Sequence, residues 1–172
     1  MAGWKVITPK PLNTAAMKAA MQREAQTLAR FIRKDFERVT AGWSGARPEW
    51  MSIVTMDGFS VTVEITVRDP GSEGARKWVY LDEGTRPHPI RPKKAGGVLA
   101  FPSTHQAGSR PGSLRTFRGS SGGPTVFTPE VQHPGTEARG WTVMLKEQEE
   151  PTVREWLRNA CNHAARASGH KL

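Results

Sequence analysis

The stretch "FSVTVEITV", residues Phe59 to Val67, changes the period of the sequence from helical to extended. Apolar side chains occupy every second position, and Ser, Thr and Glu fill the positions between them. This alternation predicts an antiparallel strand with one face on a core. The Asp57-Gly58 pair before it favours a tight hairpin turn, so residues 49–56, "EWMSIVTM", are predicted to be the paired strand.

A helix is predicted on each side of this sheet. In residues 13–40 apolar side chains recur every three or four positions, which predicts one long helix with a core-facing stripe, ended by Gly42 and Gly45. Residues 148–168 are predicted to form a shorter C-terminal helix, because Thr152 and Glu155 have the spacing of a capping box. Pro151 either opens this helix or kinks an earlier one that begins near Leu145.

Three shorter apolar runs, residues 78–81, 98–101 and 125–127, could complete the sheet. The last two enclose residues 103–124, a segment rich in Gly, Ser and Arg that is too polar to pack and is predicted to be a flexible basic arm.

The expected fold class is α+β. A small, mostly antiparallel β-sheet packs against the long N-terminal helix and the shorter C-terminal helix, and a long basic β-hairpin arm extends from the sheet. The length predicts a single domain, 1–172, with the sheet and its stiff Gly/Pro loops in residues 50–102 and 125–141.

Positive charge is concentrated in one part of the chain. Lys and Arg number 25 against 16 acids, a net charge of +9, and residues 84–129 contain no acid. A segment with charge of one sign favours DNA or an acidic partner, although a solvated basic loop is the simpler alternative. The candidate contacts are Arg86, Arg91, Lys93, Lys94, Arg110, Arg115 and Arg118.

Other features narrow the class of protein. A single cysteine, Cys161, excludes an internal disulfide and a multi-cysteine zinc site. The N-terminal residues lack the apolar stretch of a signal peptide, and no run approaches the length of a membrane span. We therefore expect a protein made and folded in a cytoplasm, with no membrane contact.

Two loops share the same short motifs. Residues 79–93, "VYLDEGTRPHPIRPK", contain a Gly-Thr and a His-Pro pair, and residues 131–140, "VQHPGTEARG", contain both again. Glycine permits unusual backbone angles and proline fixes them, so such loops are stiff and lose little entropy on binding. This favours a permanent docking surface over a turnover cycle. The predicted docking residues are Gly84, Thr85, His88, Pro89, His133, Pro134, Gly135 and Thr136.

Catalytic and metal sites are weaker interpretations. Asp82 and Glu83 are adjacent, so on a strand they point to opposite faces and serve better as partners of Arg86 or Arg91. No cysteine and histidine stand in a catalytic setting, and packing beside the apolar face of the last helix accounts for Cys161. We expect no catalytic residue, metal or cofactor, since the remaining candidates lack ligand spacing. These candidates are His88, His105, His133 and His163.

The two loops together resemble a known family. The motifs are Tyr80-Leu81 before Gly84-Thr85, then "HPIRP" from His88, Leu99-Ala100-Phe101, and Val131-x-His133-Pro134-Gly135-Thr136. They resemble the neck, or head-to-tail joining and tail-completion, family of long-tailed bacteriophages.

The resemblance implies a structural virion protein and not an enzyme. It implies a homo-oligomeric ring of six copies in the neck, at the head–tail junction, which joins or completes the tail and lets DNA pass. The implied neighbours are connector or head-closure, tail-terminator and tail-tube proteins.

Two alternatives belong to other classes. A free basic nucleic-acid-binding protein would interleave aromatic residues with its cations, but the acid-free segment offers only Phe101, Phe117 and Phe127. The other alternative is a virion-associated enzyme, and no sequence motif supports it.

Overall fold

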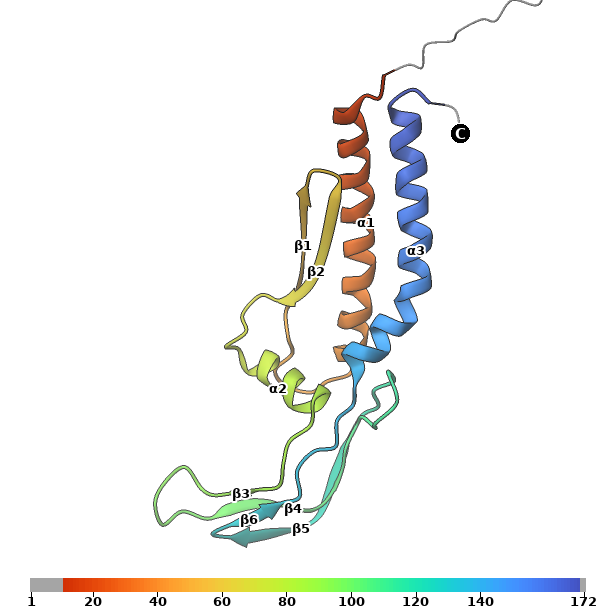
Figure 1. Ribbon diagram of the computed structural model, residues 1–172. Helices are drawn as coiled ribbons and strands as arrows, with labels where there is room; N and C mark the ends of the chain where they lie inside the picture. Colours follow the sequence, from red (N-terminus) through yellow and green to blue (C-terminus); the bar gives the residue numbers. More distant parts are fainter. Residues whose placement is uncertain (1–10, 171–172) are drawn as a thin grey trace, which may run out of the picture. The chain divides into compact units, whose positions relative to one another are not determined.

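The computed structural model describes residues 11–170, and its elements give the α+β class that the sequence predicts (Figure 1). The strands form three separate two-stranded sheets, β1–β2, β3–β6 and β4–β5, in place of one small sheet. In chain order the elements are α1 (Thr14–Thr40), β1 (Trp50–Asp57), β2 (Ser60–Val67), α2 (Glu73–Asp82), β3 (His88–Ile90), β4 (Leu99–Gln106), β5 (Ser120–Thr128), β6 (Val131–His133) and α3 (Trp141–Ala167).

The contacts divide the chain into two compact units. Of the described residues, the first contains 11–32, 52–65 and 150–170, and the second contains 33–51 and 66–149. Both long helices and the first hairpin contribute to both units, so the single domain stays a prediction. Among the described residues, no helix is long and apolar enough to cross a membrane.

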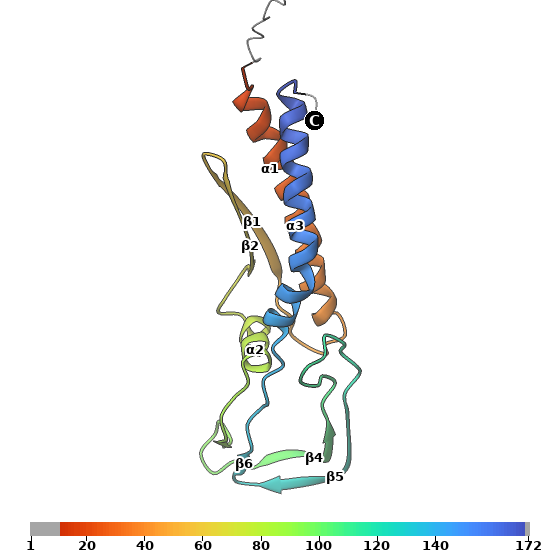
Figure 2. The same ribbon diagram turned by 45° about the vertical axis from the view of Figure 1, so that its right-hand side comes forward.

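The first unit is built from the N-terminal part of α1, the β1–β2 hairpin and the C-terminal part of α3. Here α1 and α3 run side by side in both views (Figures 1 and 2), and each buries small residues, Ala25 on α1 and Ala164 on α3. Glu24 Oε1 lies 2.8 Å from His163 Nδ1 between the two helices. The hairpin turns after Asp57, as the sequence predicts, and Lys18 lies 5.4 Å from the centre of the Phe59 ring.

The second unit has an aromatic core. Phe36 from α1 and Trp50 from β1 have ring centres 4.7 Å apart, and Trp50 meets Trp78 of α2 edge to face at 4.7 Å. Trp78 in turn lies 5.2 Å from Trp141, the first residue of α3. Tilted and edge-to-face arrangements are favourable for aromatic pairs and add to the gain from burial. Trp141 is completely buried.

Two predicted elements are wrong in kind or extent. Residues 78–81 were predicted to add to the sheet, but they lie in the helix α2. This helix begins after Ser72, whose side chain caps the N-terminus by accepting a hydrogen bond from the Ala75 N–H. The last helix begins at Trp141, not at residue 148, and contains Pro151 in its interior. Pro151 therefore lies within a helix that begins earlier, which is the second of the two alternatives that the sequence left open.

The basic arm has the predicted hairpin form but not the predicted isolation. β4 and β5 pair in antiparallel fashion from Leu99–Thr128 to Gln106–Ser120. The loop between them packs at its tip: Thr116 Oγ1 donates to the Val39 carbonyl at 3.2 Å, and Trp141 Nε1 donates to the Ser113 carbonyl at 2.9 Å. The expectation that the segment is too polar to pack is therefore wrong at the tip, and its flexibility stays a prediction.

Truncation of the buried indole should destabilise the second unit. We expect Trp141→Ala to lower the free energy of unfolding by about 3–5 kcal/mol, because it leaves a cavity between Trp78 and Trp43 and an unpaired Ser113 carbonyl. Phe127→Ala in the same unit removes a ring that is 67% exposed and should cost less than about 1 kcal/mol. Denaturant unfolding measures both, and equal losses would contradict this account of the core.

Candidate functional site

The two motif-bearing loops lie against each other and form one antiparallel ribbon, which we call the paired loops (residues 84–90 and 131–136). Thr85 and Thr136 exchange backbone hydrogen bonds of 2.8 and 3.1 Å. In the same register His88 faces His133 and Ile90 faces Val131 across β3 and β6. All eight predicted docking residues thus belong to a single structure.

Two glycines make this close pairing possible. Gly84 and Gly135 have φ angles of 79° and 91°, which L-residues with a side chain rarely adopt. A Cβ atom on Gly84 would lie 2.6 Å from the Thr136 carbonyl oxygen, and one on Gly135 would lie 2.3 Å from the Thr85 carbonyl oxygen. Each glycine therefore admits the backbone of the opposite loop, and the motif needs glycine in both places.

The facing histidines are held in different tautomers. Their rings stack with centres 5.1 Å apart. His88 Nδ1 lies 2.8 Å from the Arg86 carbonyl, which only accepts hydrogen bonds, so Nδ1 carries the proton. His133 Nδ1 accepts the Gly135 N–H at 3.0 Å, so in the neutral ring its proton lies on Nε2. Both rings fix local backbone, as expected of structural histidines.

The paired loops are anchored in the aromatic core at both ends. They leave from the C-terminus of α2 and enter the N-terminus of α3, where the Arg139 N–H donates to the Leu81 carbonyl at 2.9 Å. The Asp82 carboxylate accepts from the backbone N–H of Thr142 at 3.0 Å and from its hydroxyl at 2.5 Å. An acid at the start of α3 is favoured by the helix dipole. Asp82 is therefore a helix cap, and not the predicted partner of Arg86 or Arg91.

The predicted cationic contacts fall into two exposed groups. Arg91 Nε donates to Glu130 at 2.8 Å, and this hydrogen bond, together with the charge of Glu130, raises the pKa of Arg91 above its ordinary value. Arg86, Lys93 and Lys94 are exposed near the paired loops. The second group lies in the β4–β5 loop and consists of Arg110, Arg115 and Arg118. The fold does not gather all seven into one patch.

The candidate metal ligands outside the paired loops are His105 and His163. Within residues 11–170, no group of three or more His, Cys, Asp or Glu residues could hold a metal ion. His105 is exposed on β4 and His163 pairs with Glu24. Cys161 is also exposed, so the expectation that it packs beside the apolar face of α3 is wrong.

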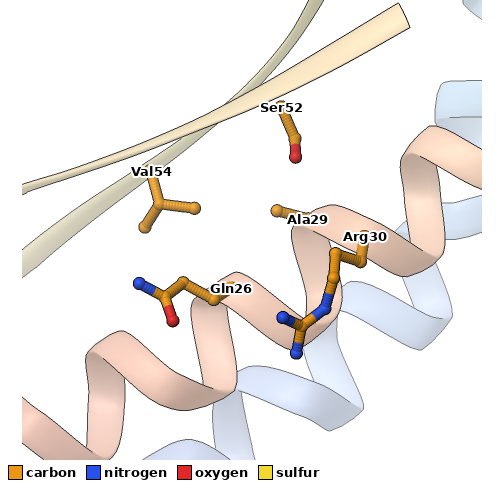
Figure 3. Close-up of a pocket in the computed structure, with 5 residues that line it drawn as sticks. All are labelled: Gln26, Ala29, Arg30, Ser52 and Val54. Carbon is orange, nitrogen blue, oxygen red and sulfur yellow. The ribbon is translucent and has the colours of Figure 1, made fainter.

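A pocket in the first unit lies between α1 and β1 (Figure 3). Among the lining residues the only charged side chain is Arg30, whose guanidinium stays protonated and cannot act as a general base for Ser52. Such a lining lacks the nucleophile–base pair that acyl transfer needs. The residues around it are Gln26, Ala29, Arg30, Ser52 and Val54.

Sequence reasoning selected the loop residues but missed their pairing. The signal is the reversed order of the motifs, Gly-Thr then His-Pro in the first loop and His-Pro then Gly-Thr in the second. Antiparallel strands bring like residues together when their order is reversed, and this places Thr85 opposite Thr136. Asp82 was assigned the wrong partner, and neither Glu130 nor the buried Arg139 was marked. In each case the true partner lies far away in the sequence.

Comparisons with protein-family models, with curated proteins and with solved structures give no match to this chain.

Substitution of either loop glycine should loosen the paired loops. We expect Gly84→Ala and Gly135→Ala each to cost about 1–3 kcal/mol for the positive φ, and more for the contact with the opposite carbonyl. Gly96→Ala is the matched control, because Gly96 has a φ of 72° but open space around it. Hydrogen exchange of the Thr85 and Thr136 amides measures the effect. Equal exchange in all three variants would contradict the close approach.

The two histidines should give distinct nitrogen spectra. In the neutral rings we expect the proton of His88 on Nδ1 and that of His133 on Nε2, because their backbone partners differ. Imidazole 15N shifts assign the tautomers, with the exposed His105 as the reference for an unconstrained ring. Two identical tautomers at positions 88 and 133 would show that the loop hydrogen bonds are absent in solution.

Proposed function

We propose that the chain is a structural protein of a tailed-phage virion, a ring component of the neck that joins or completes the tail and lets DNA pass. The observation that carries this proposal is the ribbon of paired loops. Two of the motifs that resemble the neck family meet there, because Thr85 pairs with Thr136 and His88 pairs with His133.

The stiffness of the paired loops suits a lasting contact. Positive-φ glycines, prolines and a ladder of backbone hydrogen bonds leave the ribbon few alternative conformations, so it loses little entropy when a partner covers it. His88, Pro89 and Ile90 are exposed along β3 and would form the contact. Because Asp82 and Trp141 anchor the ribbon, a force that a bound partner exerts on it would be passed to the aromatic core.

The proposed partners follow from the ring. Six identical copies would enclose the DNA path, with connector or head-closure proteins on one side and tail-terminator or tail-tube proteins on the other. The exposed cations Arg86, Lys93 and Lys94 would face channel DNA or acidic neighbours.

A free basic nucleic-acid-binding protein is the second candidate. It is favoured by Arg115, whose guanidinium lies 5.9 Å from the centre of the exposed Phe117 ring, an arrangement on which a base could stack. One such pair in the β4–β5 loop is a small platform, and the cations are split between two places, so the neck role is the better account.

Loss of the chain should separate heads from tails. In a phage whose gene for this chain carries an early stop codon, we expect filled heads and complete tails to accumulate unjoined, as seen by electron microscopy of the lysate. Complementation with the wild type or with Gly96→Ala should restore joined particles, whereas Gly84→Val with Gly135→Val should not, because valine meets the opposite carbonyls. Normal infectious particles without the chain would exclude the neck role.

A further inference from the structure

Apolar side chains are exposed on the β4–β5 hairpin of the second unit. Phe127 pairs with Ala100 and therefore lies on the opposite face of the hairpin from Phe101 and Val126, which pair with each other. Phe127 and Val98, which lies two residues before Ala100, are the more exposed apolar side chains, at 67% and 59%. Apolar groups gathered at one place on a surface mark an interaction site. Val98 and Phe127, with the exposed Lys93 and Lys94 that precede Val98 in the chain, form what we call the arm surface.

The arm surface carries charge of one sign. It belongs to the acid-free residues 84–129, and the acid that follows, Glu130, is already bonded to Arg91. Lys93 and Lys94 are exposed and make no ion pair with any residue from 11 to 170. A partner of this surface should therefore be apolar and acidic.

The β1–β2 hairpin has the opposite character. Residues 50–67 contain two acids, Asp57 and Glu64, and neither lysine nor arginine. Burial alternates along both strands, so one face is exposed and carries Ile53, which is 38% exposed, among polar and acidic residues. This hairpin face consists of Ile53, Thr55, Asp57, Ser60, Thr62 and Glu64.

Both hairpins also lack lateral partners. Each forms a two-stranded sheet, so throughout the described part of the chain their outer edges are unpaired. Isolated two-stranded hairpins are marginally stable in water, and exposed strand edges readily pair with another chain. The edges thus offer backbone hydrogen bonds in addition to the charge and apolar contacts.

We infer that the arm surface of one copy binds the hairpin face of a second copy of the chain. The two surfaces differ, so the contact is heterologous and runs head to tail, which either closes a ring or extends a filament. This inference rests on the proposed ring and names the surfaces that would form it. Val98 favours a protein partner over DNA, because an aliphatic side chain neither binds phosphate nor stacks on bases.

A reciprocal charge exchange tests this contact on the purified full-length chain. The arm variant carries Lys93→Glu and Lys94→Glu, and the hairpin variant carries Thr62→Lys and Glu64→Lys. A control variant, Lys34→Glu with Lys146→Glu, has the same change in charge as the arm variant, at exposed positions outside both surfaces. Self-association is measured by sedimentation velocity under reducing conditions, because Cys161 is exposed.

We expect the wild type and the control to associate, and added salt to weaken this association. Each surface variant alone should associate at least about tenfold more weakly, since like charges then meet in the contact. An equal mixture of the two surface variants should recover the wild-type association, because every arm then meets a hairpin of opposite charge. This recovery also shows that both variants are folded.

Three results would overturn the inference: a wild type that stays monomeric at the highest soluble concentration, a mixture that does not recover, or a control as weak as the arm variant. Binding of duplex DNA that the arm variant loses and the hairpin variant keeps, without self-association, would identify DNA as the partner instead. The assay contains no other virion protein, so its failure is distinct from failure of the neck role, which the stop-codon phage tests.

Discussion

The contact between Trp78 and Trp141 is the constraint on which the second unit depends. It joins the α2 helix to the first residue of α3, and Trp43, Trp50 and Phe36 complete the cluster around it. Because the C-terminus of α2 and the N-terminus of α3 are thereby neighbours, the loops that leave them start side by side. Their pairing needs only the two glycines that permit close approach.

The fold was predictable where the sequence signal is local and long. The helix α1 was predicted at residues 13–40 and found at Thr14–Thr40, with the Asn13 side chain accepting the Ala16 N–H. The alternation in β2 and the turn after Asp57 likewise gave the first hairpin. The run of residues 78–81 was too short to show a period, and only the Ser72 cap marked the helix. The start of α3 was missed because its anchor is Trp141, a tertiary contact.

The candidate site was predictable in composition but not in geometry. Glycine and proline indicated stiff loops, since their effect on the backbone is intrinsic to the residue. Two features bring the loops together: the reversed order of their motifs, and the positions of α2 and α3. The sequence shows the motif order, but it does not show where the two helices lie. The tip contact of Ser113 with Trp141 joins residues far apart in the chain, and no local pattern announces it.

The aromatic cluster also determines how the molecule can be observed. Four indoles with neighbouring centres 4.7 to 6.3 Å apart lie in the second unit, and each couples to the transition dipoles of the others. Among the described residues the first unit has one indole, Trp156, which is half-buried on α3. Near-ultraviolet circular dichroism of this protein is therefore dominated by one unit. Loss of that signal reports disordering of the aromatic core, while the helical signal in the far ultraviolet reports both units together.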